Sequence, residues 1–385
     1  MRAVEALDLA RLAGTAAAGI ARTSLRTQEA VTEAAYTAVE AGVGPAVRPL
    51  RLLHRGAVRG IYGCVTLGLR GAAALAGRLA EDRVTGEGTV AESPRTRPVL
   101  GALNALAGDR LAAQGSSLAY QLSLRHQGRP VPLEPTALTT TYGVGERRLA
   151  VFVHGLVEDE TVWTYQAVRR HGDPAMSLGV TLRREFGHLP LFVRYNSGAP
   201  IAANGAALAR FLDDLVANWP GGVDELLLVG HSMGGLLIHS ALALEVLACR
   251  DLVTAVITLG APTDGAPLER LADTVARTAV DIPPATWLAD VLDIRSRGIV
   301  DLGAPIDPVG YDGTPRHLAV YGSLAPWSHP VTNRLGDGMV PVPVGVPWYG
   351  SAPADGGTVV LPGLGHQGLV NHPRVHEAVT AWLRG

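Results

Sequence analysis

Residues 225–235 read Glu-Leu-Leu-Leu-Val-Gly-His-Ser-Met-Gly-Gly, an apolar run that ends abruptly in the pattern Gly-x-Ser-x-Gly. The run before this pattern is typical of a buried strand, and the apolar residues after it are typical of a helix. A serine at the tip of so sharp a turn strains its backbone and crowds the positions two residues before and after it. Gly230 and Gly234 occupy those positions and lack the Cβ atom that would not fit. The stretch therefore predicts a nucleophile elbow with Ser232 at its tip.

A serine hydroxyl is a weak nucleophile unless a base takes its proton, and the base needs a third group to hold its tautomer. After an elbow of this kind the partners follow in the order Asp or Glu, then His. Asp337 lies in a glycine-bracketed turn after a strand-like run at 317–322. His366 lies in a glycine-rich loop after a last strand-like run. The sequence therefore predicts Ser232, Asp337 and His366 as the catalytic residues.

One alternative acid is present. Asp264 also follows a strand-like run, but Asp337 is preferred because it precedes the final strand, where the acid usually lies. Three other histidines lie on the elbow helix or at the closing helix and are not in a loop after the last strand: His239, His372 and His376.

The negative charge that develops on an attacked carbonyl oxygen needs N–H donors aimed at it. One predicted donor is the backbone N–H of Met233, which follows the serine. Residues 149–157 read Leu-Ala-Val-Phe-Val-His-Gly-Leu-Val, an apolar strand that ends in His-Gly. The N–H of Leu156 is the second predicted donor of this oxyanion hole. His154 and Gly155 are expected beside it in the substrate pocket.

Several short motifs together resemble one superfamily from about residue 118 to the C-terminus. They are Val153-His154-Gly155-Leu156, the Gly-His-Ser-Met-Gly-Gly of 230–235, the Leu-Gly-Ala-Pro of 259–262, the Gly-Asp-Gly-Met-Val-Pro of 336–341, and Gly365-His366. With these motifs the chain resembles the lipase and esterase branch of the α/β-hydrolases. It is similar to bacterial triacylglycerol lipases and to GPI-inositol-deacylase-like hydrolases. Those families often carry a histidine near Asp264 and Gly265, where this chain has Thr263 and Asp264.

The order of the predicted elements indicates an α/β fold. Strands are predicted near 118–125, 136–142, 149–153, 190–195, 225–229, 254–259, 317–322 and 357–361, and helix-length segments separate most of them. This alternation predicts a mostly parallel sheet covered by helices on both faces. The hydrolase domain is expected over 99–385, beginning with a short helix at 99–114.

The N-terminal sequence is of a different kind. Residues 1–82 are predicted as a helical accessory region and residues 83–98 as a polar linker. The first 80 residues hold ten arginines and five acidic residues. Arg-rich amphipathic helices can lie on a lipid surface, whereas Ala- and Gly-rich helices pack closely with one another. The sequence therefore allows two roles for residues 1–80: peripheral contact with a membrane, or packing on the hydrolase domain or on a second copy of the chain. It does not determine the oligomeric state.

The segment 265–300 is too long for a simple connection. It is expected to form two helices broken by Pro283-Pro284, either as a lid or cap over an apolar acyl pocket or as part of the sheet's outer layer. Three tryptophans are candidate pocket walls and are equally compatible with core packing: Trp163, Trp287 and Trp327.

The composition limits the remaining possibilities. Hydrophobic residues make up 47% of the chain and charged residues 18%, as expected for a buried sheet, and a net charge of −2 gives no reason to expect a nucleic-acid partner. The chain has no lysine, and its two cysteines offer neither a disulfide framework nor metal-ligand spacing. No cofactor or metal is expected. No signal peptide or membrane-spanning helix is evident, so a cytoplasmic location is expected.

The resemblance implies a serine hydrolase that cleaves carboxylic esters, of small molecules or lipids, through a covalent acyl-enzyme. The apolar segment 265–300 and the resemblance favour a lipid-like acyl group. An acyltransferase would use the same three residues and exclude water. A non-catalytic scaffold that binds lipid or a partner is the remaining alternative.

Overall fold

The computed structural model describes residues 91–94, 96–265, 296–305, 315–326, 330–343 and 357–385, together with Glu5 and Asp8. The chain divides into two compact units. The larger comprises residues 94–115, 119–278 and 295–385, and the smaller comprises residues 1–93, 116–118 and 279–294. Within the smaller unit, the Asp8 carboxylate accepts hydrogen bonds from the backbone N–H and the hydroxyl of Ser117, both at 2.8 Å. The predicted accessory region over 1–82 otherwise lies outside the described residues.

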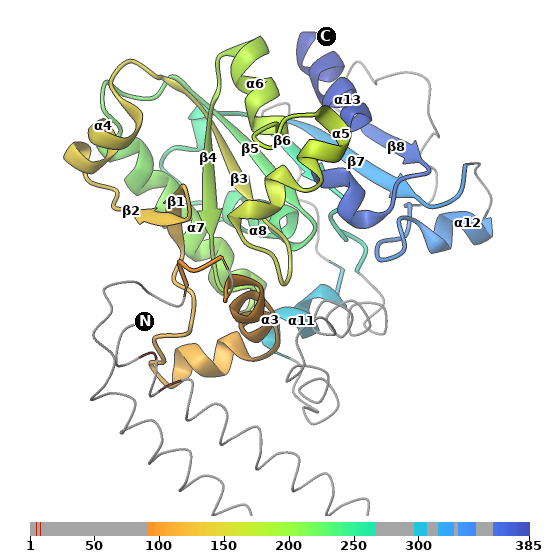
Figure 1. Cartoon of the computed structure of the whole chain (residues 1–385), viewed down its shortest axis with the longest axis horizontal. Coiled ribbons are helices and arrows are strands. Elements are labelled where there is room, and N and C mark those ends of the chain that lie inside the picture. Colours follow the sequence, from red (N-terminus) through yellow and green to blue (C-terminus); the bar gives the residue numbers. More distant parts are fainter. Residues whose placement is uncertain are drawn as a thin grey trace, which may run out of the picture. The chain divides into compact units, whose positions relative to one another are not determined.

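Eight strands of the larger unit form one sheet in the order β2-β1-β4-β3-β5-β6-β7-β8 (Figure 1). Neighbouring strands from β4 to β8 run parallel, whereas β1 pairs antiparallel with both β2 and β4. The strands are β1(Ser123–His126), β2(Arg129–Val131), β3(Arg148–Val153), β4(Leu189–Arg194), β5(Glu225–His231), β6(Val253–Leu259), β7(Arg316–Ser323) and β8(Thr358–Pro362).

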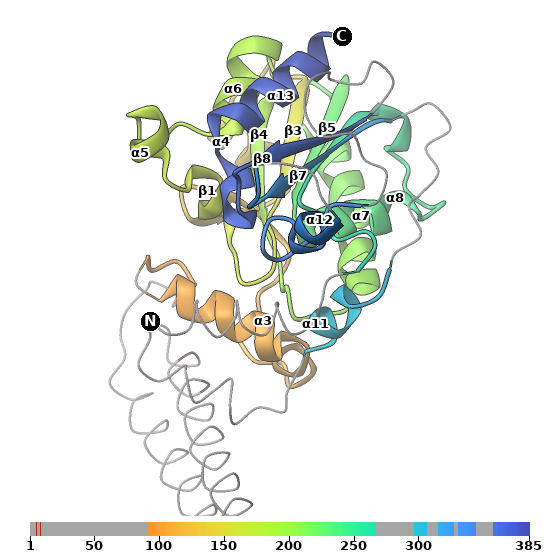
Figure 2. The same cartoon turned by 90° about the vertical axis from the view of Figure 1, so that its right-hand side faces the viewer.

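Helices cover both faces of this sheet (Figures 1 and 2). Leu149 and Val151 of β3 pack in one apolar cluster with α7(Ile201–Asn218) and α8(Met233–Leu242). Ala150 and Phe152 of the same strand pack in a second cluster with α6(Leu178–Phe186) and α13(Pro373–Arg384). Successive side chains of a strand point to opposite faces, so a strand covered on both sides must be apolar throughout. The predicted α/β class with a mostly parallel, doubly covered sheet is confirmed.

The remaining helices are short apart from the first. They are α3(Arg97–Ala113), α4(Pro135–Tyr142), η2(Glu160–Thr164), α5(Ala167–His171), η3(Arg250–Leu252), α11(Arg297–Leu302), α12(Pro330–Leu335) and η4(His366–Val370). Helix α3 lies where the sequence predicts one over 99–114. No helix among the described residues is long and apolar enough to cross a lipid bilayer.

The predicted strand over 136–142 is wrong, because these residues form helix α4. Its four threonines favour a strand by intrinsic preference, but that preference is weak and depends on context. Pro135 occupies the start of the helix, where its fixed φ favours helical backbone, and Leu138 is fully buried in the core. Packing of one apolar side chain and the proline start therefore decide the conformation.

The predicted strand over 118–125 forms only in part, as β1. It is followed by β2 instead, and the two strands are joined by Gln127 and Gly128. Both residues have positive φ, 49° and 80°. This is the backbone of a two-residue hairpin turn whose twist matches that of the strands. The six other predicted strands form as β3 to β8.

The segment predicted as a lid or outer layer, 265–300, lies outside the described residues from 266 to 295. Its last residues lead into α11. The Ser296 hydroxyl accepts a hydrogen bond from the N–H of Ile299 and so caps this helix. Asp301 of α11 accepts a hydrogen bond of 2.9 Å from the N–H of Ile201, the first residue of α7. Helix α11 is thus tied to the start of α7.

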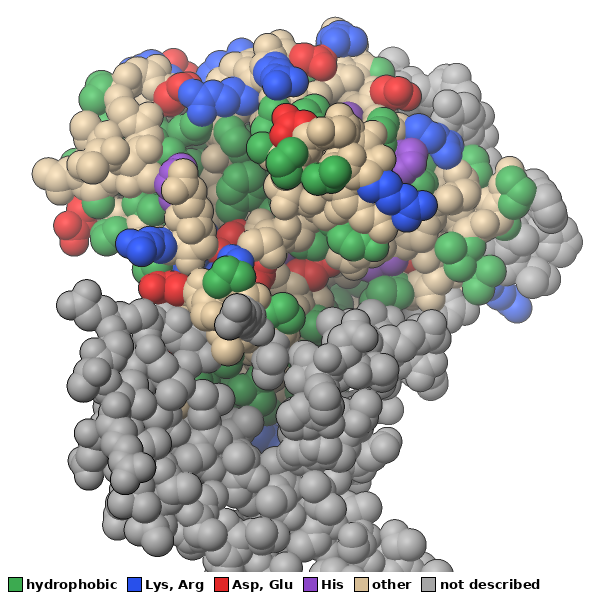
Figure 3. Space-filling model, in the orientation of Figure 1, with side chains coloured by type: hydrophobic (Ala, Val, Ile, Leu, Met, Phe, Trp, Pro, Cys, Tyr) green, Lys and Arg blue, Asp and Glu red, His purple; other side chains and the backbone are tan. Residues whose placement is uncertain are grey.

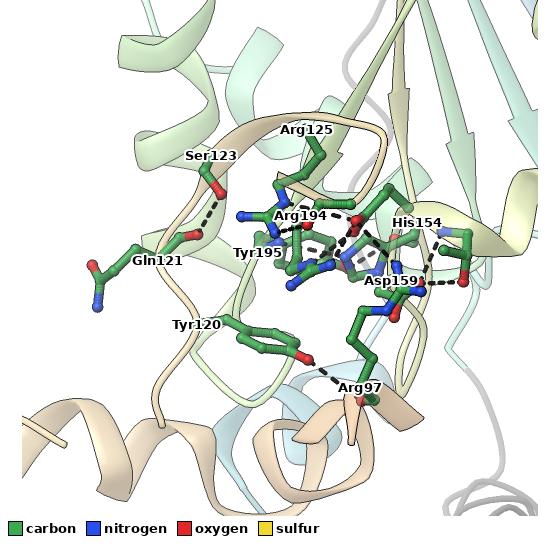
Figure 4. A network of polar contacts seen from close by, with 12 residues as sticks. Arg97, Tyr120, Gln121, Ser123, Arg125, His154, Asp159, Arg194 and Tyr195 are labelled. Carbon is green, nitrogen blue, oxygen red and sulfur yellow. Dashed lines mark hydrogen bonds and ion pairs between the residues drawn. The ribbon is translucent and has the colours of Figure 1, made fainter. Parts of the chain in front are cut away.

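A buried ionic network lies beside the loop after β3 (Figure 4). Arg194 of β4 donates to both carboxylate oxygens of Glu160, from Nε at 2.7 Å and from Nη2 at 2.5 Å. Arg97 and Arg125 approach the same carboxylate at 3.8 and 3.7 Å. The Arg194 guanidinium also lies 5.1 Å from the ring centre of Tyr120. Buried charges need such partners because a buried charge without one costs several kcal/mol.

The variant Glu160→Gln removes the negative charge from among these arginines while keeping the side-chain shape. The free energy of unfolding is expected to fall by about 3–5 kcal/mol, as measured by urea denaturation. The matched control is Glu185→Gln, which breaks an exposed pair with Arg384 and should change stability very little. Equal losses in the two variants would contradict the importance of the buried network.

Candidate active site

Ser232 lies between β5 and α8 with a φ of 51° and a ψ of −123°. Such a backbone is rare for a residue with a side chain and costs about 1–3 kcal/mol. The Ser232 N–H donates a 2.8 Å hydrogen bond to the carbonyl of Leu259 on β6, which ties the turn to the neighbouring strand. A Cβ on Gly230 would lie 2.5 Å from the backbone of α8, and one on Gly234 would lie 2.1 Å from the carbonyl oxygen of Val153. Both glycines are therefore required by close backbone contact.

His366 and Asp337 form a buried hydrogen-bonded pair. Nδ1 of His366 lies 2.7 Å from Oδ2 of Asp337, and the His366 N–H donates to the Asp337 carbonyl at 3.0 Å. The other carboxylate oxygen of Asp337 accepts from the N–H groups of Met339 at 2.9 Å and Val340 at 2.8 Å. The carboxylate accepts a hydrogen bond from Nδ1–H of His366 and so fixes the tautomer of the imidazole.

The protonation of His366 results from opposing effects. Burial disfavours the imidazolium, but the charge of Asp337, its hydrogen bond and the charge of Glu158 outweigh it, so the pKa of His366 is raised above its usual 6.5. Nε2 is buried and has no hydrogen-bond partner among the described residues. Nε2 is thus the nitrogen left to exchange a proton with a group that enters the site.

The topology brings the three predicted residues to one edge of the sheet. Ser232 follows β5, Asp337 lies after β7, and His366 lies after β8, and these strands run parallel to β6 between them. At the end of β6, a Cβ on Gly260 would lie 3.2 Å from both Oδ2 of Asp337 and Cε1 of His366. In open parallel sheets the carboxyl ends of the strands are where ligands bind.

The loop after β3 packs directly against the elbow. A Cβ on Gly155 would lie 3.0 Å from Cβ of Ser232, so the loop approaches this closely only with glycine there. Leu156 is partly buried against the apolar core, and Val157 has a φ of 68°, a strained value for a β-branched residue. Met233 is the first residue of α8, so its N–H has no acceptor within the helix. The two predicted oxyanion donors thus belong to segments that meet at Ser232.

One residue of the site is missed by the sequence motifs. The Glu158 carboxylate accepts hydrogen bonds from the N–H of Gly155 at 2.6 Å and from Nε2 of Gln367 at 2.9 Å, and it lies 2.9 Å from Nδ1 of His231. These three partners belong to the loop after β3, the loop of His366 and the strand before Ser232. Burial alone would raise the pKa of Glu158, but the charge of His231 and these hydrogen bonds lower it to about 2. One buried carboxylate therefore holds together the three segments of the site.

The signal for Glu158 in the sequence is a run of three acids, residues 158–160, directly after an apolar strand and loop. Nothing in that run says which acid faces the site. Asp159 caps η2 by accepting from the N–H of Thr161 at 2.8 Å, and Glu160 binds Arg194. The role of each acid follows only from the tertiary structure.

The side chain of His154 supports the loop rather than facing a substrate. It is fully buried, with Nδ1 2.8 Å from the carbonyl oxygen of Gly155 and Nε2 3.4 Å from the N–H of Tyr195. Its ring stacks on that of Tyr195 at 4.4 Å (Figure 4). Burial lowers the pKa of His154, so the neutral ring both donates and accepts here.

The predicted tryptophans do not supply pocket walls among the described residues. Trp163 is 1% exposed and packs edge-on against Phe152, in the cluster under α6 and α13. It is therefore a core residue, which is the alternative to a pocket wall that the sequence left open. Trp287 and Trp327 lie outside the described residues.

The alternative acid and two of the other histidines have different surroundings from this pair. Asp264 is exposed, and the carboxylate that contacts His366 is that of Asp337. His239 is buried with its ring 5.1 Å from that of His317. His376 is buried in α13, where Nδ1 lies 3.0 Å from the hydroxyl of Thr181.

One known family and several solved structures are similar to parts of this chain. Residues 203–278, which run from α7 past β6 and include Ser232, match the family model described as PGAP1-like alpha/beta domain. Among solved structures, the lipase BlEst2 of Bacillus licheniformis is 20% identical, with 62% of this chain and 91% of that chain covered and a TM-score of 0.38. An alpha/beta hydrolase fold protein of Chitinophaga pinensis is 14% identical, with 63% and 90% covered and a TM-score of 0.36. No curated protein sequence matches the chain.

These similarities between structures concern the fold alone. The parallel sheet, the elbow between β5 and α8 and the match to the family model give the chain the α/β-hydrolase fold that its motifs predict. The resemblance to the α/β-hydrolases inferred from the sequence is confirmed.

The pairing of His366 can be tested by its titration. Asp337→Asn removes the charge that favours the imidazolium, so the midpoint of His366 should fall from its raised value above 6.5. Histidine-selective NMR measures the midpoint, and His366→Gln assigns the signal among the 12 histidines. Asp264→Asn is the matched control and should leave the midpoint unchanged. A midpoint of His366 that falls in Asp264→Asn and stays unchanged in Asp337→Asn would identify Asp264 as the acid.

The contribution of Glu158 should depend on pH. Its pKa of about 2 lies below the usual 4.5, so the stability that the ionised carboxylate contributes is complete above pH 4.5 and is lost as the pH falls toward 2. Glu158→Gln should therefore lower the free energy of unfolding by about 1.5–3 kcal/mol near neutral pH, with a smaller loss in acid. Urea denaturation across this pH range measures the difference, with Glu185→Gln as control. A loss that stays constant down to about pH 3 would refute this account.

Proposed function

We propose that this chain is a serine hydrolase that cleaves carboxylic esters. Ser232 is the nucleophile, His366 the general base and then the general acid, and Asp337 the group that orients and supports the imidazole. The observation that carries the proposal is the buried 2.7 Å contact between His366 and Asp337 at the sheet edge where the strained Ser232 lies. A strained serine and a buried imidazole nitrogen without a described hydrogen-bond partner, at the same edge of the sheet, are a costly arrangement that nucleophilic catalysis explains.

The proposed reaction proceeds in two halves. Oγ of Ser232 attacks the ester carbonyl carbon while Nε2 of His366 takes the hydroxyl proton. The tetrahedral intermediate collapses, the bond to the alcohol oxygen breaks, and the imidazolium gives its proton to the departing alcohol. Water then attacks the acyl-enzyme with His366 again as base, and the acid is released with Ser232 restored. All proton transfers use side chains of this chain.

In the proposed reaction, negative charge develops on the carbonyl oxygen of the substrate when Ser232 attacks. The loop after β3 lies close enough to Ser232 to supply a hydrogen-bond donor to that oxygen. The N–H groups of Leu156 and Met233 are the proposed donors to the oxyanion, and loss of one such donor typically costs about 3–4 kcal/mol of transition-state stabilisation. The raised pKa of His366 makes it a stronger base, because Asp337 stabilises the imidazolium as the proton arrives.

The proposed substrate class is an ester with an apolar, lipid-like acyl group. The resemblance of the motifs to lipases and esterases supports this choice. An acyltransferase would form the same acyl-enzyme and pass it to another acceptor, so the fate of the acyl group distinguishes the two.

The proposal is tested with p-nitrophenyl esters from acetyl to palmitoyl. Ser232→Ala should lower kcat by about 10⁶-fold, because the triad acts as a unit. Ser123→Ala, on β1 far along the chain from the elbow, is the matched control and should keep full activity. The profile over acyl length reports the size of the acyl pocket. Equal turnover by the wild type and Ser232→Ala would refute the assignment.

A further inference from the structure

A cavity of about 550 Å³ borders the catalytic histidine on a side that the proposed mechanism does not yet use. Two segments line it. One is the turn before α5 and the helix itself, and the other is the glycine-rich loop from β8 through His366 to the start of α13. Its lining holds two arginines and two histidines and no acidic residue.

The positive charges of this cavity lie close together. Arg169 and Arg170 follow each other on α5, and His372 faces them from the start of α13. Figure 3 shows arginine and histidine side chains gathered in the area where Figure 1 draws α5 and α13. Arg170 is held in place by Tyr165, whose ring centre lies 5.4 Å from the guanidinium, and by a 3.0 Å hydrogen bond to the carbonyl of Gly368. Among the described residues, neither arginine forms an ion pair with a carboxylate.

The electrostatics agree with this geometry. Burial lowers the pKa of His372, and the charges of Arg170 and Arg374 lower it further, with Glu377 opposing them. Burial also lowers the pKa of Arg170, and the charge of Arg169 lowers it further. The charges of Arg169 and Arg170 repel each other, and a bound anion would relieve that repulsion, while the lowered pKa leaves His372 neutral near pH 7 as a hydrogen-bonding group.

The place of the cavity in the reaction follows from the role of His366. The imidazolium gives its proton to the departing alcohol, so the alcohol half of the ester must lie next to this side chain. The cavity shares His366 with the proposed catalytic residues, although Ser232 and the proposed oxyanion donors are not among its lining residues. Its two arginines suit an alcohol half that carries an anion and extends past His366.

We propose that Arg169, Arg170 and His372 form a subsite for a phosphate group on the alcohol half of the ester. Arginine suits this task because its planar fork donates two parallel hydrogen bonds to phosphate oxygens. The proposal rests on the proposed ester hydrolysis for its role in turnover, but binding of phosphate by the cavity does not depend on turnover.

Binding is measured first, on the full-length Ser232→Ala protein, by calorimetric titration with inorganic phosphate, glycerol 3-phosphate and glycerol. Both phosphates should bind and glycerol should not. Arg169→Gln should weaken binding about tenfold or more, because it removes a charge-assisted donor that makes no ion pair in the fold. Arg184→Gln makes the same charge change at an exposed position outside the cavity and should leave binding unchanged. No phosphate binding, or equal loss in both variants, would overturn the subsite.

Turnover is measured second, on otherwise wild-type protein, with the butyryl esters of glycerol 3-phosphate and of glycerol. The phosphate ester should have the higher kcat/KM, and Arg169→Gln should remove this preference while leaving the neutral ester unchanged. Phosphate binding without such a preference would overturn the role in substrate selection and leave a site for free phosphate. Failure to hydrolyse any ester, with phosphate binding intact, would count against the proposed function and not against the subsite.

Discussion

The strained turn at Ser232 is the constraint around which the rest of the larger unit is arranged. A strand must become a helix at one residue, and that residue keeps a φ of 51° although it is not glycine. The hydrogen bond to Leu259, the close approach of the loop after β3 and the two flanking glycines hold this backbone in place. Strands β3, β5 and β6 must therefore end in register at the same edge. Strain of about 1–3 kcal/mol is tolerated only where surrounding structure determines it fully.

Acidic side chains directly after β3 also hold the segments of the site in place. Three consecutive acids after β3 point to three different environments, and each has its own hydrogen-bond partners. Glu158 binds the segments of the site, Asp159 caps η2, and Glu160 binds Arg194. The rigid network around Arg194 thus fixes the far end of the same loop whose near end touches Ser232. Both the position of the loop that carries the proposed oxyanion donor Leu156 and the buried network around Glu160 depend on this short stretch of chain.

Local patterns in the sequence predict most of this fold, and tertiary contacts decide the rest. Apolar runs that alternate with helical segments predict β3 to β8, and the glycine-bracketed motifs predict the pairing of His366 with Asp337. The helix at 135–142 could not be predicted from its threonines, because burial of Leu138 outweighs their preference for strands. The role of Glu158 depends on His231 and Gln367, which are distant in sequence, and the place of Trp163 depends on its packing against Phe152. Neither of these contacts produces a periodic pattern of residues in the sequence.

The central claim is that Ser232 is a nucleophile activated by His366. The most direct measurement is labelling of the full chain with an organophosphonate probe, followed by mass spectrometry of the modified peptide. The account predicts one adduct per chain, on Ser232, with labelling strongly slowed in a folded His366→Gln variant because no base remains to take the hydroxyl proton. Absence of an adduct on Ser232, or labelling at an unchanged rate without His366, would contradict it.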